Sequence, residues 1–187
     1  MPMITSNASD EHLVTDFQQT GNTDSLETLI RRYIGKIRAL IYPMVLNDAD
    51  ADDLTQEVFI LVVRAIGGFQ RKSRFSTWLY RIAMNTTNSF LRKKQRIPPA
   101  TDSDLPTLID QAPIPPDRLA MLEIDHNISE ALASLSPCLR AAINLTAIHG
   151  LKAVEAARIA GCSIAVLYWR VYQARRLLRM KLRKQLK

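Results

Sequence analysis

The stretch RFSTWLYRIAMNTTNSFLRKK, from Arg74 to Lys94, carries the strongest pattern in this chain. It interleaves four aromatic residues with five cations and contains no acidic residue. An amphipathic helix of a soluble domain produces such a pattern when apolar anchors alternate with solvated Lys and Arg. A surface that grips a nucleic-acid backbone and stacks on exposed bases produces it too. Composition alone leaves both interpretations open.

The overall composition predicts an all-helical protein. A chain of 187 residues forms one domain or two small ones, and 47% hydrophobic residues suffice for real cores. There are only 6 glycines. The sequence also lacks the alternation of β-branched residues that marks strands. We therefore expect helices and no sheet.

The charge distribution indicates two contacts with a polyanion. The net charge is +7. Residues 58–100 contain nine Lys or Arg and no Asp or Glu, and residues 156–187 again contain nine and none. Two separate basic blocks predict two separate nucleic-acid contacts.

Several function classes are not supported by the sequence. Cys138 and Cys162 form no C-x-x-C pair, and the histidines do not lie at zinc-ligand spacing around them, so we expect no metal and no cofactor. The sequence shows no arrangement of a nucleophile with a neighbouring base, so we expect no catalytic residues. The chain has no basic-then-apolar leader and no apolar run long enough to span a membrane, which predicts a cytoplasmic protein.

The first third of the chain predicts a flexible lead and two helices. Residues 1–10 are polar and without periodicity, and a short helix is expected at Glu11–Gln19. Asp24 followed by Glu27 resembles a capping box and opens a second helix with apolar residues at helical spacing. This helix is expected to end before Pro43 or to bend there.

A third helix begins in the acidic segment Asn47–Asp53 and is expected to end at Gly67-Gly68, with a loop over Phe69–Ser73. Its first two turns present an acidic, polar face. On pattern alone, that face is either a solvated helix start or a binding surface. The face is formed by Asp52, Asp53, Gln56 and Glu57.

Residues 97–117 form a linker between two predicted domains, at 11–96 and 118–187. The segment holds six of the nine prolines and no Lys or Arg, and its charges are all acidic. Such a composition gives no incentive to form a core. A plain solvated tether is one interpretation of it.

The second domain is predicted to contain a helix-turn-helix. One helix ends near Leu135, and Ser136-Pro137 caps and opens the next, which runs to His149. A short helix at Ala153–Ala160, a tight turn and a long helix from Ile164 follow. The exposed side of the last helix should enter the major groove or grip its phosphates. That side presents Tyr168, Trp169, Arg170, Tyr172, Gln173 and Arg176.

Three motifs resemble those of bacterial ECF (extracytoplasmic function) sigma factors, particularly the envelope-stress subclass. The order from Trp78-Leu79-Tyr80-Arg81-Ile82-Ala83 to Asn85 is similar to their promoter-melting segment. Asp50–Phe59 resembles the pattern D-x-x-D-L-x-Q-E-x-F. The helix-turn-helix lies between A-L-x-x-L-S and A-R-x-L-L-R motifs, as in the family. The resemblance covers roughly residues 11–179.

The resemblance implies an all-α protein of two helical domains joined by the Pro-rich acidic linker, the second domain with a helix-turn-helix. Such a protein binds core RNA polymerase, recognises two promoter elements in promoter DNA and assists strand separation. It has no active site and no small-molecule substrate. The linker would thread through the polymerase channel, and an anti-sigma factor, often membrane-anchored, would hold the protein inactive.

The resemblance also assigns residues. The polymerase-binding residues would be Asp50, Asp52, Asp53, Leu54, Gln56, Glu57 and Phe59. The residues at the downstream promoter element would be Arg71, Lys72, Arg74, Phe75, Trp78, Tyr80, Arg81 and Asn85. Asn85 would read a base edge, the cations would hold phosphates, and Phe75 with Tyr80 would prop the melted strand. Trp78 at such a position is more often a core residue.

The recognition helix departs from the family. Family members usually have Gly-Thr-Val-Lys/Arg-Ser-Arg where this chain has Ala165-Val166-Leu167-Tyr168-Trp169-Arg170. Bulky Tyr168 and Trp169 replace a cation and a serine on the DNA face, so the usual upstream-element sequence should not be assumed.

Three competing interpretations remain. A helix-turn-helix regulator without polymerase would need neither the acidic helix nor the spacer nor the melting segment. A nucleic-acid enzyme would need acidic residues near the basic blocks, and here they gather at helix starts and in the linker. An anti-sigma or adaptor protein would differ in failing to support promoter-dependent transcription.

Overall fold

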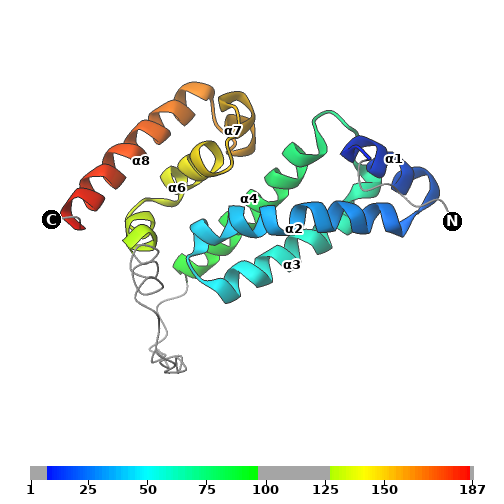
Figure 1. Ribbon diagram of the computed structural model, residues 1–187, viewed down its shortest axis with the longest axis horizontal. Helices are drawn as coiled ribbons and strands as arrows, with labels where there is room; N and C mark the ends of the chain where they lie inside the picture. Colours follow the sequence, from blue (N-terminus) through cyan, green and yellow to red (C-terminus); the bar gives the residue numbers. More distant parts are fainter. Residues whose placement is uncertain (1–7, 97–126, 186–187) are drawn as a thin grey trace.

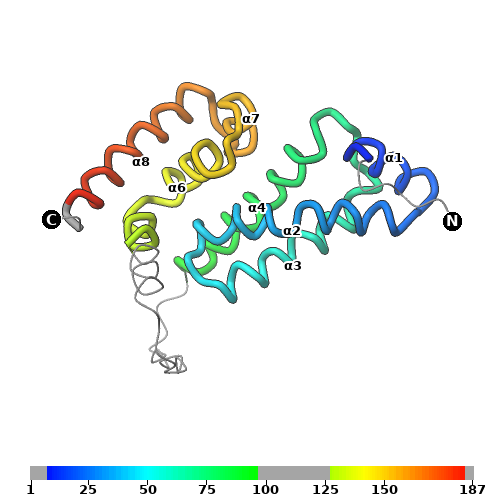
Figure 2. Tube along the Cα trace, in the orientation of Figure 1, coloured from blue at the N-terminus to red at the C-terminus, as the bar shows by residue number. Residues whose placement is uncertain are grey.

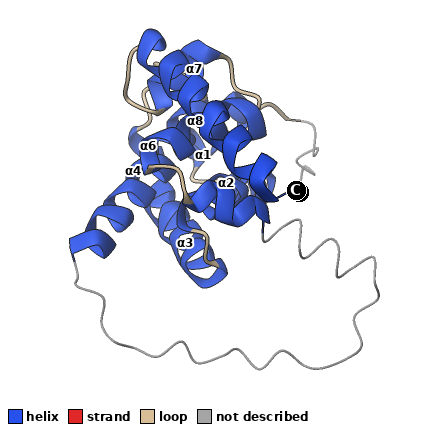
Figure 3. Ribbon diagram, turned by 90° about the vertical axis from the view of Figure 1, so that its left-hand side faces the viewer, coloured by secondary structure: helices blue, strands red, loops and turns tan. Residues whose placement is uncertain are grey.

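A computed structural model of the chain describes residues 8–96 and 127–185, and every regular element in these ranges is helical (Figures 1 and 3). The described helices fall into two groups, and the second contains a helix-turn-helix. The predicted fold class is confirmed. The predicted linker and most of the predicted lead lie outside the described residues.

The first domain is built on three long helices that lie side by side (Figure 2). A short helix covers one end of them, and a brief 3-10 turn follows the third helix. The elements are α1 (Asp10–Thr20), α2 (Thr23–Val45), α3 (Asp48–Ala65), η1 (Ile66–Gly68) and α4 (Phe75–Arg96).

Side-chain caps set the starts of the first three helices. Ser9 accepts a hydrogen bond from the His12 amide, and Asn47 accepts one from the Asp50 amide. The second helix is capped by Asn22, which accepts from the Asp24 amide at 3.1 Å. The prediction of Asp24 as the cap is wrong, because the Asn22 side chain accepts from the Asp24 amide and leaves Asp24 inside the first turn.

The second helix also continues past Pro43, so the stop expected before this residue is wrong. Pro43 lies inside α2 and is buried, and the helix ends two residues later, before Leu46, whose φ is 56°. A proline removes one helical hydrogen bond, the one to the carbonyl four residues earlier. Here that carbonyl belongs to Ala39, in the last turns of α2.

The core of the first domain is apolar. Pairs of residues four apart on each long helix face the other two helices, as expected for an amphipathic stripe. The fully or almost fully buried pairs are Ile37 with Ile41, Val58 with Val62, and Leu79 with Ala83.

The described part of the second domain begins with residues 127–133, which are helical. Its elements are α6 (Pro137–Ile143), η2 (Asn144–Ile148), α7 (Ala153–Ile159) and α8 (Ile164–Gln185). The helix predicted from Pro137 to His149 is therefore not uniform, because it widens into a π-helical turn at Asn144. Gly161, with a φ of 62°, makes the tight turn between α7 and α8.

The two domains pack against one another. Helix α6 and the π turn lie against α2, and α7 lies against α4 (Figure 1). The sequence left open whether the domains associate within one chain, and in this structure they do.

Candidate protein and nucleic-acid interfaces

The predicted acidic face of α3 is present and largely exposed. Asp52, Asp53, Gln56 and Glu57 all point to solvent. Two cations from neighbouring helices neutralise part of its charge. Arg38 of α2 donates to Asp52 and to Asp48, both at 2.6 Å, and these bonds raise its pKa further. Lys94 of α4 lies 2.8 Å from Asp50.

Two residues of the predicted polymerase-binding set lie under the acidic face. Leu54 and Phe59 are 3% and 8% exposed and pack in the core. Their role is to hold α3 in place, since side chains so deeply covered have little surface to offer a partner. The direct contact is therefore expected mainly from the exposed members of the set, with Phe59 reaching the surface only at the edge of a groove.

An apolar groove beside the acidic face was not predicted. It lies between α2 and α3, has a volume of about 470 Å³, and is rimmed by Gln56 and Arg64. Its apolar lining is Ile30, Ile34, Phe59, Ile60 and Val63. Exposed apolar side chains gathered in one place are typical of a protein-binding surface. The sequence does contain a signal for this groove, the unbroken apolar run VFILVV at 58–63. One buried stripe of a helix needs only part of such a run, so the remaining apolar side chains must lie at the surface.

The loop before α4 presents three cations and is tied to the rest of the domain by Gln18. Arg71, Lys72 and Arg74 are exposed. Gln18 of α1 donates to the carbonyls of Ile66 and Phe69 at 2.9 and 3.0 Å, and it accepts from Arg71 at 2.9 Å. The φ of Arg71 is 55°, so these bonds hold the loop in a left-handed turn. Gln18 was not anticipated as a positioning residue.

The aromatic residues of the predicted melting segment separate into core and surface. Phe75 is 1% exposed, with its ring centroid 5.6 Å from that of Tyr33 and 5.8 Å from that of Trp78. Trp78 is half-buried, 4.9 Å from Phe69. Phe75 leaves almost no ring surface free to prop a melted strand, and packing of the aromatic cluster accounts for its position.

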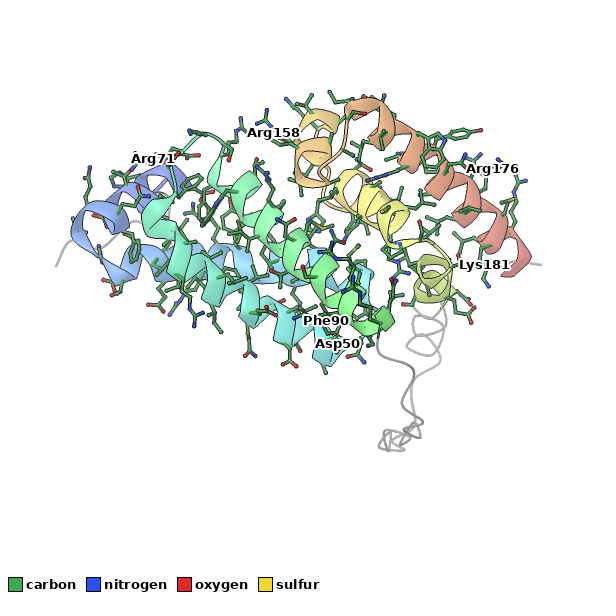
Figure 4. The ribbon with its side chains drawn as sticks, turned by 180° about the vertical axis from the view of Figure 1, so that it is seen from behind. Asp50, Arg71, Phe90, Arg158, Arg176 and Lys181 are labelled. Carbon is green, nitrogen blue, oxygen red and sulfur yellow. The ribbon has the colours of Figure 1, made fainter. Side chains whose placement is uncertain are left out.

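Arg81 and Asn85 are exposed on α4, one turn apart. Asn85 lines a second groove, between α3 and α4, of about 290 Å³. Glu57 of the acidic face and Lys93 of α4 line the same groove. Figure 4 shows the far end of this region, where Asp50 and Phe90 lie near one another. The two surfaces predicted on the first domain therefore meet at one groove.

Donors from the second domain bond to backbone carbonyls near the end of α2. Arg140 donates to the Met44 carbonyl at 2.7 Å, and Asn144 donates to the Leu40 carbonyl at 2.6 Å. His149 lies close to the backbone of Ala39, the residue that Pro43 deprives of its helical partner. The last carbonyls of a helix lack internal partners as well. We call these six residues, Ala39, Leu40, Met44, Arg140, Asn144 and His149, the interdomain seam.

The seam is polar and incompletely satisfied. Arg140 is 9% exposed and Asn144 is fully buried. Burial lowers the pKa of both Arg140 and His149. Among the described residues, three buried side-chain atoms have no hydrogen-bond partner, namely Arg140 Nε, Asn144 Oδ1 and His149 Nε2. All three lie in the seam, where each such atom costs about 1–3 kcal/mol.

Closure of the domains covers part of the predicted DNA surface. Tyr80 is 7% exposed, with its ring centroid 5.7 Å from that of His149. Glu155 of α7 lies 3.9 Å from Arg74. The structure therefore brings Arg71, Lys72, Arg81 and Asn85 to the surface and keeps Tyr80 beneath the second domain.

The predicted recognition face of α8 is exposed. Tyr168, Trp169 and Tyr172 are 62%, 57% and 64% exposed, while Arg176 is exposed and Arg170 and Gln173 are half-buried. The opposite side, Leu167, Val171 and Ala174, is buried. Among the described residues no cluster of three or more metal-ligating side chains occurs, and no helix is long and apolar enough to cross a membrane.

Comparison with known proteins gives concordant matches. The family described as Sigma-70 region 2 matches residues 29–97. The chain is 30% identical to the ECF RNA polymerase sigma-E factor of Haemophilus influenzae, over 93% of this chain and 95% of that one. It is 31% identical to the RNA polymerase sigma-H factor of Pseudomonas aeruginosa, over 89% and 90%.

Two solved structures share the fold. One is CnrH in complex with the cytosolic domain of CnrY, with a TM-score of 0.72 and 24% identity over 94% of this chain and 97% of that one. The other is the sigma factor RpoE in complex with the anti-sigma factor NepR from Bartonella quintana, with a TM-score of 0.65 and 24% identity over 84% and 96%.

Proposed function

The chain belongs to the ECF family of RNA polymerase sigma factors, and from that premise we propose that it binds core RNA polymerase, recognises two promoter elements and assists promoter melting. The observation that carries the proposal is the groove shared by Glu57 and Asn85. It joins an acidic surface suited to a protein partner to a cationic surface suited to DNA. We assign no catalytic step to the chain itself.

The polymerase contact combines charge with apolar burial. Asp53, Gln56 and Glu57 supply an exposed polar face, and the neighbouring α2–α3 groove supplies Ile34 and Ile60, which are 48% and 51% exposed. Interfaces generally have an apolar centre with a polar rim. The polymerase would therefore cover the groove and pair with the acidic face.

The downstream promoter element is gripped by cations and read by an amide. Arg71, Lys72 and Arg81 are exposed and would hold phosphates. Asn85, in the groove between α3 and α4, would read the edge of an unstacked base. Unstacking a base costs a few kcal/mol, and these contacts would offset it.

The upstream element is contacted by α8. Its exposed face carries the aromatic residues and Arg176, and the helix-turn-helix fold places such a face in the major groove.

Promoter engagement requires the domains to separate. Tyr80 can reach a melted strand only after His149 leaves its ring, and Arg74 must leave Glu155 to hold a phosphate. The closed arrangement is therefore a resting form. The structural relatives are described with CnrY and with the anti-sigma factor NepR, and we propose that an anti-sigma factor likewise retains this chain.

The decisive experiment is run-off transcription with core RNA polymerase and a promoter library, with and without this chain. New transcripts that share two spaced elements are the expected result. Asn85→Ala should reduce promoter opening by about 10-fold or more while binding to core is retained, whereas Asn88→Ala, one turn along the same helix, serves as the matched control.

Two outcomes would contradict the proposal. Binding to DNA without any binding to core would make the chain a helix-turn-helix regulator. Equal loss of core binding and promoter opening in Asn85→Ala would remove the base-reading role assigned to Asn85.

A further inference from the structure

The N-terminal end of α8 lacks the side chains that form paired hydrogen bonds with bases. Its first two turns, Ile164–Trp169, contain no carboxylate, amide, guanidinium or ammonium group. Ile164 and Val166 are 42% and 40% exposed, and Tyr168 and Trp169 are more exposed still. The preceding Ser163 is engaged as a cap and accepts a hydrogen bond from the Val166 amide at 3.2 Å.

The geometry of the helix places Trp169 at the outermost point of this face. Successive residues are rotated by about 100°, so Trp169 lies opposite the buried stripe of Leu167, Val171 and Ala174. Ala165, one turn earlier, is small and leaves the indole uncrowded. The first side chains able to form two hydrogen bonds with a base, Arg170 and Gln173, are half-buried at the flanks.

The surroundings of this apolar end suit DNA. Helix α8 has no acidic residue, and residues 164–187 carry eight cations. Figure 4 shows Arg158 on α7 and, along α8 beyond its first turns, Arg176 and then Lys181. Cations that lie next to the apolar end would hold phosphates.

We propose that Tyr168 and Trp169 read the upstream element through apolar contact with thymine methyl groups. The major groove presents the C5-methyl of thymine, and apolar side chains recognise it. Guanine and adenine are read mainly by Arg, Lys, Asn or Gln, which this end of the helix lacks. The inference rests on the proposed function, in which α8 contacts promoter DNA, and it adds the base that α8 prefers.

The test replaces thymine by uracil, which removes the methyl group and leaves every hydrogen-bonding group in place. The holoenzyme, formed from core polymerase and the full chain, first selects promoters from duplexes randomised in the upstream element. Each selected thymine is then replaced singly, with replacements in the spacer as controls. Loss of one buried methyl should lower run-off initiation roughly fourfold per contacted thymine.

Two variants connect the effect to the helix. In Trp169→Ala the thymine and uracil templates should initiate equally, because the methyl has lost its partner. Met180→Ala, a partly exposed apolar residue of the same helix, should keep the full thymine preference. Comparing the two templates within one variant cancels any general loss of folding or core binding. Trp169→Arg should shift selection toward guanine.

Three results would overturn the inference while leaving the proposed function intact. They are a selected upstream element without thymine, uracil templates that initiate as well as thymine templates, and an unchanged thymine preference in Trp169→Ala. The first two would point to a protein partner for this apolar surface. If no promoter in the library is transcribed, the proposed function itself fails, and the inference fails with it.

Discussion

The core of the first domain and the interdomain seam are both buried between helices, but the core is apolar and the seam is polar. The core joins Ile, Val, Leu and Phe side chains, whereas the seam joins Arg140 and Asn144 to backbone carbonyls. Apolar surfaces lose nothing when they meet, but a buried polar group costs free energy unless every atom is bonded. The apolar core is therefore suited to holding the helices of the first domain together permanently, and the polar seam to letting the two domains separate.

The largest effect is expected in the core. Phe75→Ala should lower the free energy of unfolding by about 3–5 kcal/mol, because it leaves a large cavity among Tyr33, Phe69 and Trp78. Thermal or urea unfolding would measure it, with exposed Ile60→Ala changing stability by no more than about 0.5 kcal/mol. A stable Phe75→Ala protein that had lost only promoter melting would restore the DNA role first predicted for Phe75.

The next effect is expected at the seam. Asn144→Asp preserves the shape of the side chain but replaces a donor by a carboxylate facing the Leu40 carbonyl at 2.6 Å. The closed arrangement should lose about 3 kcal/mol or more, while each domain stays folded. Small-angle X-ray scattering should show a larger radius of gyration. The same change at Asn88 of α4 is the control, and an equally compact Asn144→Asp protein would contradict a releasable seam.

A smaller effect follows from pH. Burial lowers the pKa of His149 from its ordinary value of 6.5, so the closed form favours the neutral ring. Above that value the ring is neutral in both forms and no penalty exists, whereas the closed form should weaken as the pH falls below it. Scattering from pH 8 to pH 5 should show progressive opening. His149→Gln should remove this pH dependence, and an unchanged profile in that variant would assign the effect elsewhere.

The smallest effect is expected at Arg74 and Glu155. Their charged atoms are 3.9 Å apart, and the Arg74 side chain is 78% exposed, so solvent and salt screen the pair. Glu155→Gln should change domain closure by no more than a few tenths of a kcal/mol, measured by scattering at low and high salt. If Glu155→Gln separated the domains as much as Asn144→Asp does, domain closure would depend more on this ion pair than on the hydrogen bonds to backbone carbonyls.

The sequence predicted the elements of the fold well. Apolar periodicity and capping residues located α3 and the helix-turn-helix, because each of these helices carries its own apolar stripe and is followed by its own helix-ending residues. The stop expected before Pro43 was wrong, since a proline near the end of a helix removes one hydrogen bond and leaves the rest intact. Asn22 was overlooked because Asp24 matched a capping pattern equally well.

The candidate site was predicted only in part. Exposed residues such as Asn85 and Trp169 follow from helical position, but burial of Phe75 depends on Tyr33 of another helix. The seam could not be found by pattern, since the acceptors of Arg140 and Asn144 are backbone carbonyls with sequence separations of 96 and 104. Backbone acceptors carry no residue identity for a sequence to reveal.

Pro43 gives the chain an order of assembly on the ribosome. The backbone carbonyls at the end of α2 are in place as soon as this helix has formed. Arg140 and Asn144, which donate hydrogen bonds to two of them, lie roughly a hundred positions downstream in the sequence. At about 5–20 residues per second, translation delivers them roughly 5–20 seconds later. Tyr80 is made 69 residues before His149, so its ring stays uncovered for roughly 3–14 seconds, and newly made protein passes through an open form before its first closure.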